Sequence, residues 1–517
     1  MCKGKATYRK DSKMTLFPLV FPKMRGAVCA AAILSAGTAV ADVTAAQVWA
    51  DWQENLSIYG EDGLSVGAET MQGNTLTVSD IVLTLDDEYN DITATLGDLM
   101  FVENGDGTVT VEMAATYPIN ITADDDATVK MTVTQSGLVL NVGGTPEEMV
   151  YNVTADQYGI IVGDIVEDGE KIDADFRIVA NDVSGSYTSK AGELRAVDFD
   201  MAVASVDMLV DVVPPDASGE YVTFSGKITG LSSKGSSTMP IGEAAEDVES
   251  LFVNGLGFDI GYAYQSASYL FDINADGEQL SGTARTGAGS LNATMNAAHI
   301  SYDASVSDMN VAFEGAAIPF PIEVSAAEYG IGFDMPLAKT DEPADFGLRV
   351  NLTNLAVNDM IWMLADPTGA LPHDPATLLI DLSGKAKMFF DLLDPAQTDA
   401  IAMSDIPGEL NAVTLNNLSL KLGGAELTGL GDFTFDNSDL DTFDGMPRPA
   451  GEVTMNLKGG NALIDSLVEM GLIPEDQAMM GRMMMGMFAR SVGDDELSSK
   501  IEINDEGHVI ANGQRIQ

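Results

Sequence analysis

The sequence has little cysteine, histidine and positive charge, and each shortage excludes a class of site. Its 517 residues include two cysteines, Cys2 and Cys29, and three histidines. Because both cysteines lie near the start, the rest of the chain forms no disulfide, thiolate metal site or thiol nucleophile. The 26 basic residues are scattered and stand against 79 acidic ones. Nucleic-acid binding is therefore excluded, since it needs clustered Lys and Arg to neutralise phosphates.

Sequence motifs for catalysis and metal binding are also missing. His299, His373 and His508 are far apart, and the chain has no H-E-x-x-H, G-x-S-x-G, S-x-x-K, P-loop or G-x-G-x-x-G pattern. We therefore predict a protein that is not an enzyme and has no cofactor or metal. The segment 272–277 matches half of a calcium loop, but Thr283 stands where a bidentate Glu is required. It predicts a hairpin turn instead.

Residues 1–41 have the pattern of a secretory signal peptide. Seven basic residues precede the apolar run 26–40, which is too short to span a bilayer and leads into the small-x-small site Ala39-Val40-Ala41. We expect cleavage after Ala41 and a location in the periplasm of a Gram-negative bacterium. Removing the seven bases and one acid of this leader leaves 19 basic and 78 acidic residues. No later segment reaches the ~18 apolar residues of a membrane helix, so no transmembrane segment is expected in the mature chain.

Alternation of apolar and polar residues with period two is the most abundant pattern. It is clear at 109–113, and at 418–422 it leads into Gly423-Gly424. Short alternating runs joined by Gly-rich turns predict antiparallel hairpins with one buried face. The expected fold is mainly β with a few short helices, in elongated or curved antiparallel sheets built from hairpin repeats.

A weak repeat of an apolar residue, Ser or Thr, and Gly lies within these strands. Its copies are 183–185, 224–226, 280–282, 382–384 and 427–429. Each Gly predicts a bend or bulge where a strand enters the sheet. The alternative is that Ser-Gly is simply common in β proteins.

Few helices are expected. Thr44-Ala45-Ala46-Gln47 fits a capping box, followed by Val48, Trp49, Trp52 and Leu56 on one face and by Gly60 as the stop. Further helices are predicted at about 242–252, 358–364, 461–470 and 474–489. Proline-rich punctuation suggests an N-terminal β-rich region at 42–240, a middle one at 241–340 and a C-terminal one at 341–517 with a Met-rich helix.

The Met-rich helix is the most unusual local feature. Six methionines fall within nine residues, from Met479 to Met487. Thioethers at helical spacing suit Cu(I), but they also form adaptable apolar surfaces. With no Cys or His close by in sequence, we interpret one set as the face for an apolar ligand or partner. This face consists of Met479, Met480, Met483, Met484 and Met487.

Several blocks resemble a known family. They are 48–52, 318–321, 362–377, 431–435, 443–449, 483–486 and 511–515. Together they are similar to an alphaproteobacterial family of exported proteins, domain of unknown function 2125, and this resemblance implies no activity or catalytic residues. More weakly, 415–435 and 505–513 look like the β repeats of AsmA-like envelope proteins, which form curved sheets with an apolar groove.

The leading hypothesis is an exported, non-enzymatic envelope protein of an uncharacterised family that binds lipid or another apolar ligand in a β-sheet groove. One alternative is an outer-membrane β-barrel or porin-like protein, which is disfavoured by 7% aromatics and by Gln517 as the last residue. A second alternative is a hydrolase with no readable motif.

Overall fold

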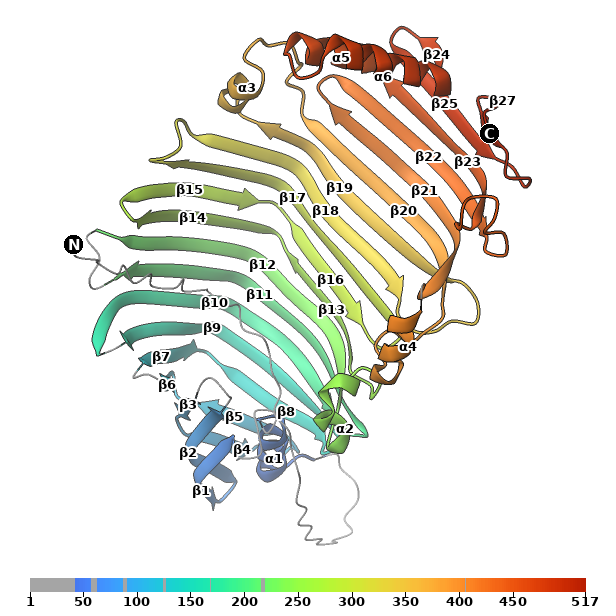
Figure 1. The fold of residues 1–517 in the computed structure, drawn as a ribbon. Coiled ribbons are helices and arrows are strands. Elements are labelled where there is room, and N and C mark those ends of the chain that lie inside the picture. Colours follow the sequence, from blue (N-terminus) through green and yellow to red (C-terminus); the bar gives the residue numbers. More distant parts are fainter. Residues whose placement is uncertain are drawn as a thin grey trace, which may run out of the picture.

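The computed structural model describes residues 42–56, 63–86, 91–123, 127–167, 169–214, 219–404 and 406–517. The predicted signal peptide and the helix stop at Gly60 lie outside these residues. The described strands, 27 in number, pair into one antiparallel sheet. Figure 1 shows this sheet as a single curved layer with short helices along its margins. The predicted fold class is therefore confirmed.

The N-terminal part consists of one helix and eight short strands. They are α1 (Ala45–Leu56), β1 (Leu64–Gln72), β2 (Thr75–Asp86), β3 (Asp91–Leu96), β4 (Leu99–Glu103), β5 (Val109–Met113), β6 (Thr116–Ala123), β7 (Ala127–Ser136) and β8 (Val139–Thr145).

The middle of the sheet contains the longest strands. They are β9 (Glu148–Glu167), β10 (Glu170–Lys190), β11 (Leu194–Val213), β12 (Tyr221–Pro240), β13 (Gly257–Tyr264), β14 (Ser266–Ala275), β15 (Glu278–Thr286), β16 (Gly289–Met295), β17 (His299–Gly315), β18 (Ile322–Pro336) and β19 (Ala344–Val357). The short helix α2 (Glu243–Glu246) follows β12.

The C-terminal part contains the remaining strands and most of the helices. They are α3 (Asp359–Ala365), β20 (Ala376–Met388), α4 (Thr398–Met403), β21 (Gly408–Leu422), β22 (Ala425–Asp436), β23 (Arg448–Lys458), α5 (Gly460–Glu469), α6 (Glu475–Phe488), β24 (Arg490–Gly493), β25 (Glu496–Ile503), β26 (Val509–Ala511) and β27 (Gln514–Arg515).

Most of the predicted helices are confirmed. In the capping box of α1, the Thr44 backbone N–H donates to Gln47 Oε1 at 2.9 Å and the Gln47 N–H donates to Thr44 Oγ1 at 3.3 Å. Helices α3, α5 and α6 lie where the sequence predicts them. The helix expected at 242–252 is shorter, because only α2 and a single 3-10 turn form there. Helix α4 is not predicted.

The regional boundaries expected near 240 and 340 fall at loops. One follows β12 and the other separates β18 from β19. Hydrogen-bonded pairing continues across both, since β12 pairs with β13 and β18 pairs with β19. The division into three regions stays a prediction.

A crease crosses the sheet where residues in the middle of long strands have positive φ. They include Asp182 in β10, Gly230 in β12, Asp308 in β17 and Asn354 in β19. The pairing registers place Ala204 of β11 opposite both Asp182 and Gly230, so neighbouring strands share the crease. Regular pairing resumes on both sides.

The side-chain alternation changes phase at this crease. Tyr158 of β9 lies on one side of it and Tyr187 of β10 on the other, yet both line the same cavity. Tyr158 pairs with Ala180 of β10, so the even-numbered residues of β10 before Asp182 lie on the apolar face. Tyr187 places the odd-numbered residues after Asp182 on the same face. The apolar face therefore continues across the crease and lies inside the bend at this end of the sheet.

Three of the five repeated glycines do not form the bulges that the sequence suggested. Gly185, Gly226 and Gly282 lie within regularly paired strands, whereas register shifts lie on both sides of Gly384 and beside Gly429. At the first four glycines a Cβ atom would meet a large side chain from the neighbouring strand. These side chains are Met201, Tyr269, Phe271 and Phe346, respectively. These four glycines thus provide room for a neighbour.

The buried core is confined to the N-terminal end. There α1 packs against β2, β4 and β5, with Val48 and Trp49 almost completely buried. The rings of Trp49 and Trp52 lie 5.8 and 5.5 Å from the ring of Phe101 in β4. From β9 onward the sheet is one layer thick, so its strands expose side chains on both faces (Figure 1).

Candidate functional site

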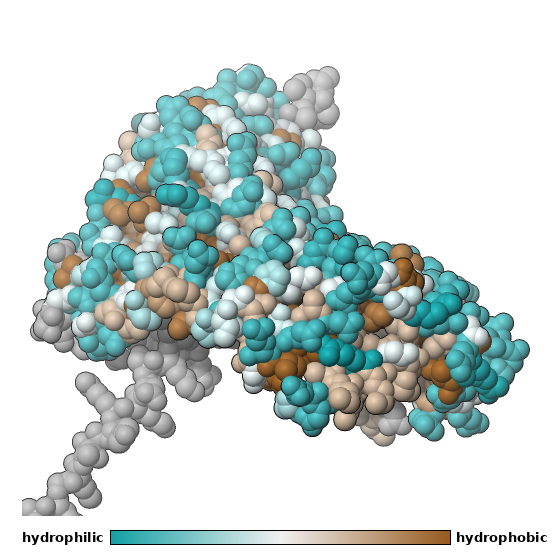
Figure 2. Space-filling view, turned by 90° about the horizontal axis from the view of Figure 1, so that it is seen from above, coloured by the Kyte–Doolittle hydropathy of each residue, from teal (hydrophilic) through white to brown (hydrophobic). Residues whose placement is uncertain are grey.

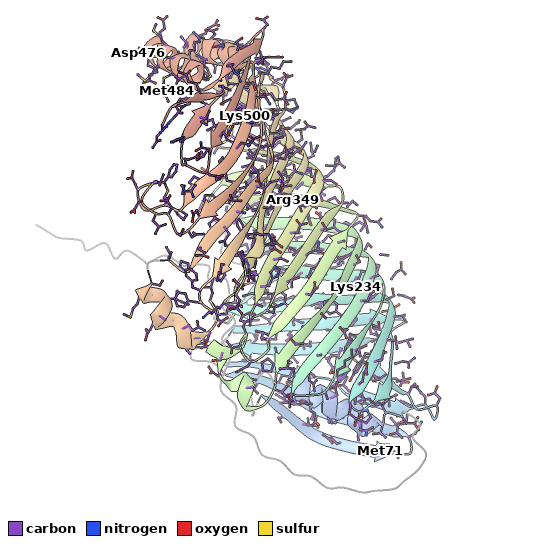
Figure 3. The ribbon with its side chains drawn as sticks, turned by 90° about the vertical axis from the view of Figure 1, so that its right-hand side faces the viewer. Met71, Lys234, Arg349, Asp476, Met484 and Lys500 are labelled. Atoms are coloured by element: carbon purple, nitrogen blue, oxygen red, sulfur yellow. The ribbon has the colours of Figure 1, made fainter. Side chains whose placement is uncertain are left out.

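The two faces of the long sheet differ in chemistry. One face carries charged side chains that pair across neighbouring strands, such as Lys227 with Asp207 at 2.7 Å and Lys500 with Glu452 at 2.7 Å. Arg349 also pairs with Asp303 on this face. In Figure 3, Lys234, Arg349 and Lys500 follow the sheet from one end toward the other. We call this the polar face.

The opposite face is apolar along almost the whole sheet. Registered pairs form rows of side chains that cross many strands. One row contains Val162, Phe176, Val210, Phe224, Phe271, Gly282, Phe313 and Ile322. A second row, on the other side of the crease, contains Tyr262, Leu291, Ala304, Ile331, Val350, Ile380, Leu418, Gly429 and Met455. We call this surface the apolar face.

Many side chains of the apolar face are exposed to solvent. Ile178 is 53% exposed, Tyr329 47% and Leu422 53%. Other exposed members are Ile160, Phe176, Val222, Tyr262, Leu280, Ile331, Phe333, Met335, Leu348 and Leu420. Single exposed apolar residues are normal on a protein surface, but a contiguous set of this extent is typical of a binding surface.

Helices stand at both ends of the apolar face. Helix α1 packs at the N-terminal end, and α5 and α6 lie at the C-terminal end (Figure 1). The backbone carbonyl of Phe488, at the end of α6, accepts from Ser499 Oγ at 2.7 Å, and Ser499 pairs with Met455 of the second apolar row. The sheet and its end helices therefore form an apolar trough.

An apolar cavity of about 350 Å³ lies at the α1 end of this trough. Its lining residues are Trp49, Trp52, Ile81, Leu83, Leu96, Leu99, Met113, Ala114, Tyr117, Ile119, Val133, Gln135, Leu138, Tyr158 and Tyr187. None of these described residues is charged. Desolvation by burial is the main cause that raises the pKa of the Tyr117 hydroxyl to about 12 and also raises the pKa of Tyr158. The tyrosines of the cavity are therefore neutral at physiological pH.

A buried polar network fixes α1 to the sheet beside the cavity. Asp51 of α1 accepts a hydrogen bond from the Tyr151 hydroxyl at 2.6 Å and from Arg195 Nη1 at 3.2 Å. Arg195 Nη2 also donates to Glu54 at 2.5 Å. The Tyr151 ring stacks on Tyr187 with centroids 4.3 Å apart. Burial, followed by the bond to Asp51, raises the pKa of Tyr151 far above its ordinary value.

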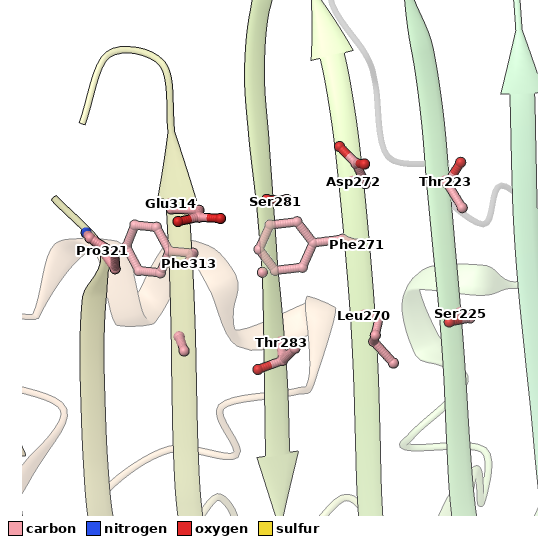
Figure 4. Close-up of a pocket in the computed structure, with 12 residues that line it drawn as sticks. Thr223, Ser225, Leu270, Phe271, Asp272, Ser281, Thr283, Phe313, Glu314 and Pro321 are labelled. Atoms are coloured by element: carbon pink, nitrogen blue, oxygen red, sulfur yellow. The ribbon is translucent and has the colours of Figure 1, made fainter. Parts of the chain in front are cut away.

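A second hollow, of about 550 Å³, lies in the middle of the sheet. Figure 4 shows the ring of Phe271 over the strand that carries Ser281 and Thr283, and the ring of Phe313 beside its own strand, on the side away from Phe271. Gly282 pairs with both phenylalanines in the first apolar row, and the Phe271 ring fills the space beside it, since a Cβ atom there would lie 2.6 Å from Phe271 Cζ. The lining residues Ser281 and Thr283 alternate with Gly282 along their strand, so the hollow lies mainly on the polar face.

The predicted methionine face lies on α6 and is exposed. Met479, Met480, Met483, Met484 and Met487 are 56–67% exposed. Of the described residues of α6, Ala478 is buried. Figure 2 looks onto the end of the molecule that carries α5 and α6, and brown and tan apolar surface appears there in patches among hydrophilic surface. The role of these methionines in ligand or partner contact stays a prediction.

The histidines lie apart from one another and from the cavity. His299 Nε2 lies 2.9 Å from Asp334 on the polar face, and the His373 ring stacks on Trp362 at 4.4 Å. Nearby, the Leu371 backbone N–H donates to Asp366 and is the main cause that lowers the pKa of this carboxyl. Within the described ranges, no group of three or more His, Cys, Asp or Glu side chains is arranged to hold a metal ion.

The half calcium motif forms a hairpin turn, as predicted. Asp276 and Gly277 both have positive φ, at 53° and 79°, and they connect β14 to β15. Asp272 accepts hydrogen bonds from the Tyr221 hydroxyl at 3.0 Å and from Gln279 at 3.1 Å. Its carboxylate thus joins strands β12, β14 and β15.

The residues that form the trough cannot be identified from the sequence pattern alone. Tyr158, Ile178 and Tyr329 lie in strands whose alternation changes phase at the crease, so no single periodic pattern connects them. A signal existed in the large apolar residues two positions apart on both sides of Asp182 and Asp308. This pattern can be recognised only when the residue with positive φ between the two sets is known.

Comparison with known proteins gives one family match. The family model described as uncharacterized protein conserved in bacteria (DUF2125) matches residues 266–512. No curated protein and no solved structure matches the chain. The resemblance to this family is therefore confirmed, whereas the likeness to AsmA-like envelope proteins has no match to support it. In the part of the chain that the structure describes, no helix has the length and apolarity needed to cross a membrane.

Proposed function

Because the chain belongs to the bacterial DUF2125 family through residues 266–512, and this family description assigns no activity, we propose a function from the geometry. The protein is a non-enzymatic, exported envelope protein that binds the acyl chains of a lipid on its apolar face. The observation that carries the proposal is the exposed, continuous apolar face opposite a face that carries paired charges. The signal-peptide pattern of residues 1–41 supports a periplasmic location.

The length of the apolar rows favours an extended hydrocarbon ligand. The second row crosses nine strands, and at a spacing of about 4.8 Å between strands it extends for roughly 38 Å. A bilayer core of about 30 Å contains two acyl chains end to end. One row therefore offers more length than two acyl chains need.

Useful affinity sets the apolar area that a ligand must cover. Micromolar binding corresponds to about 8 kcal/mol, and burial of apolar surface contributes about 25 cal/mol per Å². A ligand must therefore cover on the order of 300 Å² of apolar surface, and it must cover more than this to offset the free-energy cost of association. The large side chains of the apolar face are spread over many strands, so one acyl chain can contact several of them at once.

The direct test is mass spectrometry of organic extracts from protein that has been purified from its native periplasm without detergent. We expect lipid or fatty acid above the level in an unrelated periplasmic protein. The same sample tests export, because the intact mass should correspond to a chain that begins at Asp42. A chain that retains the leader, or extracts without lipid, would contradict the corresponding part of the proposal.

A pair of matched variants tests which face binds. Leu422→Asp places a charge on the apolar face and Leu430→Asp places one on the polar face, at residues that are 53% and 62% exposed. Leu430 shares its row with Thr454 and Lys500. We expect Leu422→Asp to lower the bound lipid and Leu430→Asp to leave it unchanged. Equal lipid in both variants would exclude the apolar face as the site.

A further inference from the structure

The cavity at the α1 end differs from the rest of the trough because it is walled by aromatic rings. Trp49 is 2% exposed, and its indole N–H donates to Glu69 Oε1 at 2.8 Å. Trp52 packs edge-on against Phe101. Both indole rings thus pack against the strands of the N-terminal part and form one wall of the cavity.

The cavity opens onto the apolar face. Tyr158 lines the cavity, and Ile160, two residues along the same strand, pairs with Ile178 of β10. Both isoleucines are exposed members of the apolar face. A hydrocarbon chain lying on this face can therefore pass from Ile178 over Tyr158 into the cavity without crossing a polar strand surface.

The lining determines which end of a lipid can enter. None of the described lining residues carries a charge, and the side-chain amide of Gln135 is already engaged by the Met113 carbonyl at 3.1 Å and the Leu138 N–H at 3.3 Å. A carboxylate or phosphate inside would lose its hydration without a charged partner. With about 350 Å³, the cavity is at the lower end of the range of about 300–1,000 Å³ for ligand pockets.

We propose that this cavity is a terminal pocket that binds the methyl end of an acyl chain, while the polar head group of the lipid remains outside the cavity. This inference rests on the proposed lipid-binding function and adds an orientation to it. A straight hydrocarbon end fits the chemistry of the pocket, whereas a charged head group does not.

The orientation can be tested by tryptophan quenching. The chain has three tryptophans, so Trp362→Phe leaves emission only from Trp49 and Trp52 in the cavity wall. Two probes are added to this variant: palmitic acid brominated at its terminal carbon, and palmitic acid brominated next to the carboxylate. We expect strong quenching by the first and weak quenching by the second.

The pocket itself is tested by filling it. Ala114 lines the cavity, and Ala114→Trp should weaken stearic acid binding about tenfold, the contribution of roughly two buried methylene groups. Lauric acid binding should weaken by a similar factor, because its methyl end would enter the same pocket. The control Ala263→Trp replaces an exposed alanine that pairs with Ser232 and Ser290 on the polar face. It should bind both acids like the parent protein.

The outcomes of these experiments distinguish the terminal pocket from the proposed lipid-binding function. If brominated acids bind but quench equally from both positions, or if Ala114→Trp binds stearic acid unchanged, the terminal pocket is refuted while lipid binding stands. If neither acid binds the parent protein, both proposals fail. An unchanged urea midpoint of the ligand-free Ala114→Trp variant, followed by tryptophan fluorescence in the Trp362→Phe background, verifies that α1 remains docked.

Discussion

The attachment of α1 should depend mainly on one carboxylate, that of Asp51. Its side chain accepts from Tyr151, Arg195 and Ser189. The Asp51–Arg195 pair is almost buried, with side chains 10% and 8% exposed, whereas Glu54 in the second pair is 54% exposed. Two ion pairs made by the same guanidinium therefore have very different surroundings.

The expected magnitudes follow from this difference in burial. Removing one partner of a buried ion pair destabilises a protein by about 3–5 kcal/mol, whereas an exposed pair contributes about 0–1 kcal/mol. We expect Asp51→Ala to destabilise the N-terminal end by about 3–5 kcal/mol, and Glu54→Ala by no more than about 1 kcal/mol. Because the loss is local, α1 should detach before the long sheet unfolds.

The assay is urea unfolding followed by tryptophan fluorescence in the Trp362→Phe background, where the signal comes from α1 alone. Circular dichroism of the same samples reports on the sheet. Asp51→Ala should shift the fluorescence midpoint to lower urea and leave the circular dichroism midpoint nearly unchanged. If Glu54→Ala is as destabilising as Asp51→Ala, or if both signals shift together, the reasoning from burial is wrong.

Three further results are expected. Burial raises the pKa of Tyr117 from 10.0 to about 12, so its contribution to stability is complete below pH 10 and is lost as the pH rises toward 12; Tyr117→Phe should flatten this alkaline loss in urea midpoints taken at several pH values. Gly282→Ala should lower the thermal midpoint, since its Cβ would lie 2.6 Å from Phe271 Cζ, whereas Gly163→Ala, with its nearest neighbour at 3.9 Å, should be tolerated; equal effects would contradict the packing explanation. Met480→Asp with Met484→Asp should abolish co-purified lipid without changing the thermal midpoint, and Gln477→Asp is the control; retained lipid would remove the methionine face from the site.

Local features of the fold could be predicted where local rules apply. The capping box of Thr44 and Gln47 placed α1, and Asp276-Gly277 identified a hairpin turn, because both depend on hydrogen bonds or backbone angles within a few residues. Helix α4 was missed since six residues give no periodic pattern. The trough could not be predicted because Asp182 and its equivalents reverse the alternation within long strands. Which face of a strand is apolar then depends on neighbours that are far away in sequence.

The sequence and the structure direct attention to different apolar surfaces. The sequence indicated an apolar ligand and placed the contact on Met479–Met487, where unusual composition drew attention. The more extensive apolar surface is made of ordinary Ile, Leu, Tyr and Phe residues in alternating strands, and these are indistinguishable in sequence from the buried face of a sandwich. Only the absence of a second layer over the described strands leaves them exposed.

The crease has a consequence for how this architecture can vary in size. Each long strand contacts its two neighbours, and Asp182, Gly230, Asp308 and Asn354 contribute to the bend from four separate strands. Stability in such an arrangement is approximately a sum of nearest-neighbour terms. Inserting or deleting one hairpin in the middle would preserve α1 with its aromatic wall at one end and α6 at the other, and would change only the distance between them. Trough length is thus an independently adjustable dimension, in the way that the number of repeats sets the span of a solenoid.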